Sequence, residues 1–142
     1  MPITFHPDYG TLLFCDFNHQ SPPEMVKNRP VVVLSRRKAN SGLCTVVPLS
    51  GTDPGKLECW HHKMTHDKLP EKLRNMAGDW WAKCDCLTSV SLARLERIRN
   101  GRCPNTGKRL YITPKLYGAD LDAIKLAVIN HLGMMDLIPV KQ

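Results

Sequence analysis

The stretch EMVKNRPVVVLSRR, residues 24–37, holds four consecutive apolar residues, Val31 to Leu34, directly after Arg29 and Pro30. An uninterrupted run of this kind, rich in β-branched residues, is typical of a strand buried on both faces. Proline is tolerated at the first residue of such a strand, where the missing N–H is not needed. The residue before a proline is restricted to extended geometry. We therefore predict that Arg29 enters a buried strand already extended.

Two interpretations of Arg29 follow from its surroundings. An arginine fixed at the mouth of a strand, with Glu24 five residues upstream, is a plausible start of an anion-binding site, because guanidinium groups match phosphate geometry. Alternatively, Arg29 is a surface residue beside a core strand. The residues of this stretch alone favour the second interpretation.

The segments on either side predict two more strands. Residues 11–17 (TLLFCDF) form a short apolar run in which Asp16 points outward or ends the strand. Residues 43–51 (LCTVVPLSG) follow a short turn, so an antiparallel hairpin with the central strand is expected. Pro48 predicts an edge or a bulge at the end of that strand. Residues 18–28 suit a binding loop, with His19, Glu24 and Lys27 as its polar side chains.

The remainder of the chain predicts a mainly β fold with a C-terminal helix. The expected elements are a possible strand at 56–62, a short helix at 67–78, a strand at 80–90, a helix at 91–101 capped by Ser91, a strand at 108–114 and a helix at 119–133. In the strand at 80–90, alternation puts Lys83 and Asp85 on one face. Together these elements predict one domain, residues 1–142, with a small β-barrel-like sheet.

Charge and composition narrow the range of partners. The chain has 142 residues, a formal net charge of +7 and a pI of about 9.3. Such a balance favours an anionic partner: nucleic acid, an acidic protein or a phospholipid surface. The N-terminus has no signal-peptide pattern and no apolar run reaches the ~20 residues of a membrane span. We expect a cytoplasmic protein without a membrane segment.

The six cysteines are expected to be free thiols, because the chain shows no export signal. Cys59, His61, His62, Cys84 and Cys86 could together ligate zinc, but their spacing is not that of standard zinc modules. Buried thiols are the favoured interpretation. Tryptophans 60, 80 and 81 are expected in the core rather than as stacking platforms. We expect neither a metal nor a cofactor.

Two blocks of the sequence resemble the PemK/MazF toxin family, which includes Kid. The first is GTLLFCDF, then Glu24, KNRPVVVLS, a turn and TVVPLSG, and it covers residues 10–51. The second is WAKCDCLTSVSLARL, residues 81–95, in which a basic residue, a cysteine and an aspartate precede a turn that ends in Arg-Leu. The Arg-Pro block in its context is the more specific of the two.

This resemblance implies an SH3-like barrel that forms a homodimer. It implies a metal-independent, sequence-specific endoribonuclease that cuts single-stranded RNA. The neighbouring 2′-hydroxyl attacks, leaving a 2′,3′-cyclic phosphate and a 5′-hydroxyl. It also implies an acidic antitoxin partner.

The resemblance further implies roles for individual residues. Arg29 would stabilise the phosphate and Ser50 would donate to it, while Glu24 and Asp85 are candidate bases. Lys83 stands where some members have an arginine and is assigned an electrostatic role. The place of a histidine found in some members is Pro23 here, with His19 four residues earlier. The expected RNA-binding residues are His19, Lys27, Arg36, Arg37, Thr88 and Arg94.

Two alternatives come from other functional classes. Proteins of the CcdB type resemble this barrel but poison a topoisomerase without cutting RNA. A basic RNA-binding module that has lost catalysis is the other. The presence of Arg29 and Ser50 argues against a topoisomerase poison.

Overall fold

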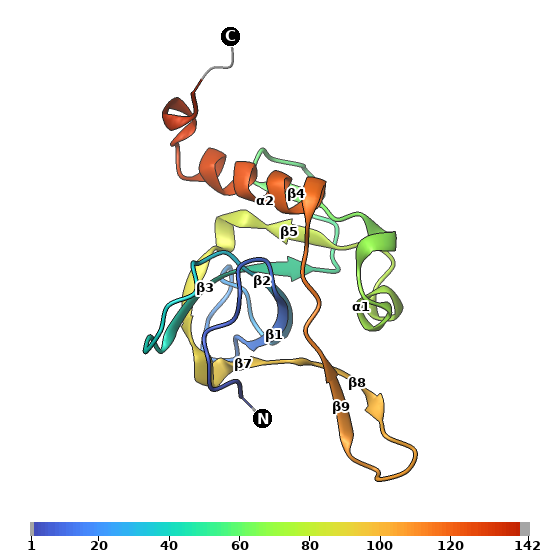
Figure 1. The fold of residues 1–142 in the computed structure, drawn as a ribbon. Helices are drawn as coiled ribbons and strands as arrows, with labels where there is room; N and C mark the ends of the chain where they lie inside the picture. The colour runs from blue at the N-terminus through green and yellow to red at the C-terminus, as the bar shows by residue number, and fades with distance from the viewer. Residues whose placement is uncertain (1, 140–142) are drawn as a thin grey trace.

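A curled antiparallel sheet forms the body of the chain, with one long helix across one end and a separate hairpin projecting from the other (Figure 1). The computed structural model describes residues 2–139. The strands are β1 Leu12–Asp16, β2 Asn28–Val33, β3 Leu43–Ser50, β4 His61–Lys63, β5 Trp81–Lys83, β6 Thr88–Ser91, β7 Leu95–Glu96, β8 Ile98–Arg102 and β9 Arg109–Ile112. The helices are α1 Glu71–Met76 and α2 Gly118–His131, with 3-10 turns η1 His66–Lys68, η2 Cys84–Cys86, η3 Leu92–Arg94 and η4 Met135–Leu137.

Strand β2 lies at the centre of the sheet. It pairs antiparallel with β1 on one side and with β3 on the other. Val31, Val32 and Val33 have no exposed surface. Because side chains alternate along a strand, Val32 packs in one core cluster and its two neighbours pack in a second. The predicted strand, buried on both faces, and the predicted antiparallel hairpin are both confirmed.

Different segments cover the two faces of the sheet. On the face of Val32, the core includes Leu73 from α1 and Ile124 from α2. On the other face, the core includes Phe17 and Met25, which flank or belong to the loop between β1 and β2. The helices therefore close one face, and the loop at residues 18–27 closes part of the other.

The prediction that Pro48 lies at a sheet edge is met only locally, because Pro48 has a strand partner on one side and none on the other. Strand β3 is flanked on both sides: β2 pairs along one side, while β6 and β5 follow each other along the opposite side. The β6 pairing ends at Val46 and the β5 pairing begins at Leu49. Pro48 lies in the gap between these two partners, where an absent N–H leaves no ladder incomplete.

The predicted strand at 80–90 and helix at 91–101 need correction. The 3-10 turn η2 interrupts the strand after Lys83, so strict alternation of Lys83 and Asp85 does not hold. Ser91 does cap a turn, accepting a hydrogen bond from the Ala93 N–H, but this turn is η3 and spans three residues. Beyond it the chain forms β7 and β8. A spacing of three between Leu92, Leu95 and Ile98 fits a helix locally, yet strand pairing with β1 prevails.

Helix α2 confirms the predicted C-terminal helix. Ile124 of its apolar stripe is fully buried, whereas Leu132 remains 47% exposed. Asp120 lies in the first turn of this helix and is buried. Among residues 2–139, no helix is both long enough and apolar enough to cross a membrane.

In the described part of the chain, the sheet is curled but does not close into a complete barrel. The strand order is β4-β5-β3-β2-β1-β7, with β6 paired to β3 beside this path. The chain passes from β6, on the far side of β3, through η3 to β7, on the far side of β1. The sheet thus wraps around β2, which accounts for the barrel-like appearance of the body (Figure 1).

Candidate functional site

Glu24 and Asp85, the two candidate bases, lie at the same hollow. The hollow has a volume of about 360 Å³ and is lined by Gln20, Pro23, Glu24, Met25, Asp85, Cys86, Leu87 and Thr88. One wall is the loop before β2, and the other is η2 with the start of β6. The structure therefore brings together two carboxylates and a hydroxyl, that of Thr88, from segments far apart in the sequence.

The loop that carries Glu24 is closed at its base. The Phe17 N–H donates to the Lys27 carbonyl oxygen at 2.8 Å, and Lys27 has a left-handed backbone with φ of 71°. The buried side chain of Met25 anchors the loop to the core. Glu24 accepts a hydrogen bond from the Ser21 N–H at 3.4 Å and stays exposed. A carboxylate held in this way is oriented but still open to solvent.

The opposite wall is fixed through Cys84. This buried residue anchors η2, and its carbonyl oxygen accepts from the Leu87 N–H at 3.4 Å. Asp85 then projects as an exposed side chain. Burial and the adjacent Asp85 carboxylate raise the pKa of the Cys86 thiol, while the Lys83 ammonium lowers it. Lys83 therefore acts electrostatically on a residue that lines the hollow.

Arg29 and Ser50 lie at the same end of neighbouring strands. Extending the β2–β3 register by two residues beyond the Val31–Pro48 pair places Arg29 opposite Ser50. Alternation puts both on the face of Val31, the face that the Glu24 loop covers. Lys83 reaches the same face, since the β3–β5 register continued from Leu49–Ala82 sets it opposite Pro48.

The hydrogen bonds of Arg29 and Ser50 determine which of their polar atoms remain available to a ligand. Arg29 is half-buried, and its Nε–H donates to the Val26 carbonyl oxygen at 3.0 Å. This bond uses one edge of the guanidinium and leaves the terminal nitrogens available. Ser50 is buried, and its Oγ accepts from the Thr52 N–H at 3.2 Å, so its hydroxyl proton is free to be donated. Neither residue lines the Glu24–Asp85 hollow itself.

The expected RNA-binding residues are spread over several surfaces. His19 and Lys27 are exposed on the loop, and Thr88 lines the hollow. Arg94 lines a separate hollow of about 270 Å³ that includes Asn28, the first residue of β2. Arg36 and Arg37 follow the opposite end of β2, six residues of strand away from the Arg29 end. Their proximity to Arg29 in sequence is therefore not proximity in space.

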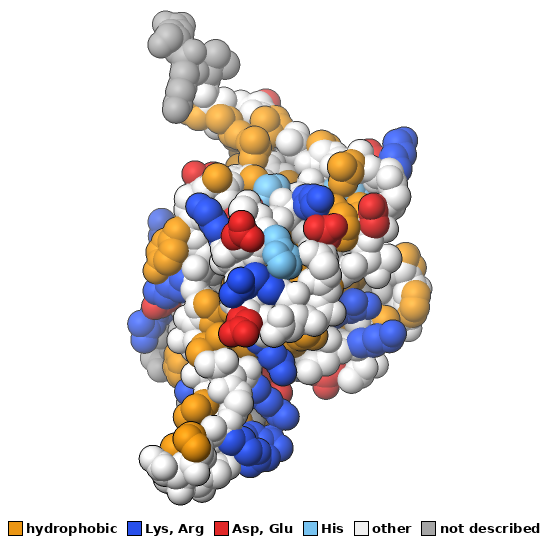
Figure 2. All heavy atoms as spheres, turned by 90° about the vertical axis from the view of Figure 1, so that its right-hand side faces the viewer, with side chains coloured by type: hydrophobic (Ala, Val, Ile, Leu, Met, Phe, Trp, Pro, Cys, Tyr) orange, Lys and Arg blue, Asp and Glu red, His pale blue; other side chains and the backbone are white. Residues whose placement is uncertain are grey.

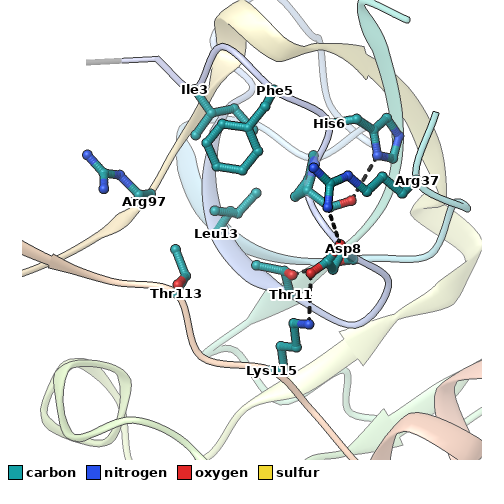
Figure 3. Close-up of a pocket in the computed structure, with 11 residues that line it drawn as sticks. Ile3, Phe5, His6, Asp8, Thr11, Leu13, Arg37, Arg97, Thr113 and Lys115 are labelled. Carbon is teal, nitrogen blue, oxygen red and sulfur yellow. Dashed lines mark hydrogen bonds and ion pairs between the residues drawn. The ribbon is translucent and has the colours of Figure 1, made fainter. Parts of the chain in front are cut away.

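Arg37 lines a pocket of about 110 Å³ that sequence reasoning did not find (Figure 3). There it forms an ion pair with Asp8 at 3.4 Å, and Lys115 pairs with the same carboxylate at 2.9 Å. The Lys115 ammonium, helped by the Arg37 guanidinium, holds the pKa of Asp8 below its usual range. Because 107 residues separate Asp8 from Lys115 in the chain, no local pattern could have joined them.

Several of the residues that could ligate zinc are engaged elsewhere or exposed. His62 Nε2 lies 2.8 Å from Asp120 Oδ1, and the Cys84 thiol donates to the Ile124 carbonyl oxygen at 3.8 Å. Cys59 is exposed. Within residues 2–139, no group of three or more His, Cys, Asp or Glu side chains is arranged to hold a metal ion. Trp80 and Trp81 are buried, as the core interpretation predicted.

Comparisons with known proteins place the chain in a family. A curated relative, the uncharacterized protein YifN of Escherichia coli (strain K12), is 32% identical over 154 residues, covering 96% of this chain and all of the relative. MazF from Deinococcus radiodurans matches the fold with a TM-score of 0.60 at 24% identity, over 92% of this chain and all of that one. A mycobacterial endoribonuclease in complex with its cognate antitoxin gives a TM-score of 0.59 at 17% identity, over 95% and 99%.

At these identities the solved structures show a shared fold, which confirms the expected mainly β architecture with a C-terminal helix. The family model described as PemK-like, MazF-like toxin of type II toxin-antitoxin system matches residues 8–106, more than half of the chain. The chain therefore belongs to the PemK-like, MazF-like family of type II toxin–antitoxin toxins.

Proposed function

We propose that this protein is a metal-independent endoribonuclease toxin that cuts single-stranded RNA at specific sequences. One observation carries the proposal: Glu24 and Asp85 line one open hollow, and Glu24 belongs to the loop that covers the sheet face of Arg29 and Ser50. Membership of the toxin family and the fold shared with a mycobacterial endoribonuclease support the same reaction class.

The proposed reaction needs a base, a charge stabiliser and a proton for the leaving group. Glu24 or Asp85 removes the proton of the RNA 2′-hydroxyl. The O2′–P bond then forms while the P–O5′ bond breaks, and the 5′-oxygen takes up a proton. The products are a 2′,3′-cyclic phosphate and a 5′-hydroxyl.

Three side chains stabilise the negative charge that builds up on the phosphorane. Arg29 contributes its terminal guanidinium nitrogens, and Ser50 contributes its hydroxyl proton. Lys83 adds positive charge from β5. Donors of this kind act best when their positions are fixed before reaction, and strands buried on both faces provide that rigidity.

The proposal extends to partners. The protein is proposed to be a cytoplasmic homodimer that an acidic antitoxin protein inhibits. The solved structures similar to it include a MazE–MazF complex from Deinococcus radiodurans, at 22% identity and a TM-score of 0.53, which supports an antitoxin partner.

Incubation of the pure protein with a long single-stranded RNA, followed by mapping of the ends, tests the proposal. We expect cuts at a recurring short sequence, each with a 5′-hydroxyl end and a cyclic phosphate. EDTA is expected to leave the rate unchanged. Inhibition of a topoisomerase without RNA cleavage, or tight RNA binding without cutting, would replace the proposal by one of its two alternatives.

A further inference from the structure

Most of the positive surplus of the chain lies on the hairpin formed by β8 and β9. Residues 97–112 contain five Lys and Arg residues and no Asp or Glu. The rest of the chain then has 15 basic and 13 acidic residues, a surplus of only two out of the total net charge of +7. A positive potential concentrated on one small element points to a polyanionic partner at that element.

The hairpin stands apart from the body. Strands β8 and β9 form their own two-stranded sheet and project from the end opposite α2 (Figure 1). A one-residue bulge between Arg99 and Arg102 includes Gly101, whose φ of +75° suits glycine. Beyond the bulge, Arg102 lies directly opposite Arg109.

The two faces of the hairpin differ in character. Ile98 is fully buried and Ile112 is partly buried against the core, so this face holds the hairpin to the body. The other face carries Arg109 and Tyr111 from β9, with Arg102 and Arg99 as their cross-strand partners. Figure 2 shows Lys and Arg side chains gathered along one side of the protruding lower end and apolar side chains along the other.

The arginines of this face have no acidic partner among the described residues 2–139. In the part of the chain that the structure describes, no Asp or Glu forms an ion pair with Arg99, Arg102 or Arg109. Arg102 donates to the Gly107 carbonyl oxygen at 2.9 Å, and Arg97 stacks on the Tyr111 ring at 4.7 Å. Like charges directly opposite each other destabilise an antiparallel pair. A bound polyanion would relieve the repulsion between Arg102 and Arg109.

The base of the hairpin leads toward the candidate site. Arg97 and Arg99 line a hollow of about 340 Å³ together with Lys72 of α1, Asn28 of β2 and one acidic side chain, Glu96 of β7. Asn28 is the residue directly before Arg29. Because side chains alternate along β2, Asn28 and this hollow lie on the face of the sheet opposite to that of Arg29. A strand of nucleic acid that passes around the Arg29 end of the sheet would meet Arg97 and Arg99 there and then the cations of the hairpin.

We propose that the β8–β9 hairpin is an RNA-binding arm, whose face of Arg99, Arg102, Arg109 and Tyr111 binds the phosphates and one base of the substrate strand beyond the cut. This inference rests on the proposed function in one respect, the choice of RNA as the polyanion that the arm binds. Arginines interleaved with an aromatic ring suit a phosphate backbone with stacked bases. An acidic peptide would need apolar anchor sites as well, and the apolar residues Ile98 and Ile112 lie on the opposite face.

A binding measurement with RNA that cannot be cut isolates the arm from catalysis. The probe is a fluorescent single-stranded RNA with 2′-O-methyl groups throughout, titrated at several salt concentrations. The arm variant is R99Q/R102Q/R109Q. The control variant, K56Q/K68Q/K125Q, removes the same charge from exposed lysines on other elements. Thermal melting confirms that both variants fold.

We expect the arm variant to bind at least about tenfold more weakly and to lose about 2 from the slope of log K against log salt, since each lost phosphate contact removes ~0.7. The control variant is expected to change binding less than about twofold. Equal losses in both variants would overturn the arm, because net charge alone would then explain them. Weaker binding to a polyglutamate peptide with unchanged RNA binding would also overturn it.

Cleavage of unmodified RNA by the same proteins separates the two proposals. Arm-dependent binding without cleavage by the wild-type protein would refute the endoribonuclease and retain the arm. Cleavage with unchanged kcat/KM and unchanged RNA binding in the arm variant would refute the arm and retain the endoribonuclease.

Discussion

Arg29 occupies a position that combines rigidity with access. It pairs with Cys15 of β1, lies in the strand that the core holds from both faces, and remains half-buried at the strand end. Within residues 2–139, the hydrogen bond of its guanidinium is the one that Nε–H donates to the Val26 carbonyl oxygen. A guanidinium placed like this can meet a phosphate without rearrangement of the backbone.

We predict that Arg29→Ala reduces the RNA cleavage rate at least ~100-fold, the scale of removing one transition-state donor. The fold should persist, because the core of the sheet does not depend on this side chain. Arg74→Ala, which removes an exposed arginine from α1, is the matched control and should cut normally. Cleavage by Arg29→Ala at close to the wild-type rate would remove Arg29 from the mechanism.

Glu24 and Asp85 face one hollow from opposite walls, so their roles are expected to be coupled. If one is the base and the other positions it, the double alanine variant should lose more activity than either single variant. General-base removal typically costs ~100- to 10,000-fold. The measurement is the single-turnover cleavage rate of the three variants. Two single variants that both cut at the wild-type rate would move the base elsewhere, with His19 as the next candidate.

The sequence identifies Glu24 and Asp85 as candidate bases but does not show that they line one hollow. The loop at residues 18–27 and η2 come together only in the folded chain. Gln20 and Leu87 also line the hollow, and nothing in their local pattern marked them. The ion pairs of Asp8 with Arg37 and Lys115 were missed for the same reason. Local sequence carries residue type and strand position, whereas long-range contacts depend on topology.

At the scale of elements, α2 is fixed to the sheet by a buried carboxylate. Asp120, in its first turn, accepts hydrogen bonds from the Thr65 N–H and hydroxyl at 3.2–3.3 Å and lies 2.8 Å from His62 Nε2. These contacts join α2 to β4 and to the segment after it. His62 and Thr65 lie 58 and 55 residues from Asp120 in the chain, so no local sequence pattern predicts these contacts.

We predict that Asp120→Ala lowers the free energy of unfolding by about 2 kcal/mol, because it leaves part-buried donors of Thr65 and His62 unpaired. Asp122→Ala, an exposed carboxylate two residues further along the same helix, is the control and should leave stability unchanged. Urea denaturation followed by tryptophan fluorescence measures both. Equal stability of Asp120→Ala and the wild-type protein would show that these bonds do not hold the helix in place.

The elements that sequence patterns predicted well are those in which local and tertiary preferences agree. The β-branched runs at 31–33 and 45–47 favour strands, and the valines of both runs are buried in the sheet. The helix near 119–133 has a stop glycine, Gly133, with φ of 70°. The helix predicted at residues 91–101 is wrong, because an apolar residue at every third position also fits short strands joined by a 3-10 turn. Pairing of β7 with β1 favours the extended conformation in that segment.

At the scale of the whole molecule, a net charge of +7 favours an acidic antitoxin that competes with RNA. We predict that a short acidic reading frame lies beside the gene and that its product displaces a substrate RNA from the toxin. The competition should weaken as salt rises, because both ligands rely on screened charge. Fluorescence competition with uncut RNA measures this. If the product of the neighbouring gene binds tightly but does not displace RNA, it is a partner of the toxin, and the prediction that it competes with RNA for one surface is refuted.

The proposed chemistry depends on the 2′-hydroxyl at the cut, so a single-atom change in the substrate tests it most directly. After the cut site is mapped, one RNA is made with a 2′-deoxynucleotide on the 5′ side of the scissile phosphate and ribose elsewhere. We predict that the protein binds this RNA as tightly as the unmodified strand and does not cut it, while the unmodified strand yields a cyclic phosphate and a 5′-hydroxyl. Cleavage of the deoxy-substituted RNA at the unmodified rate would contradict the mechanism.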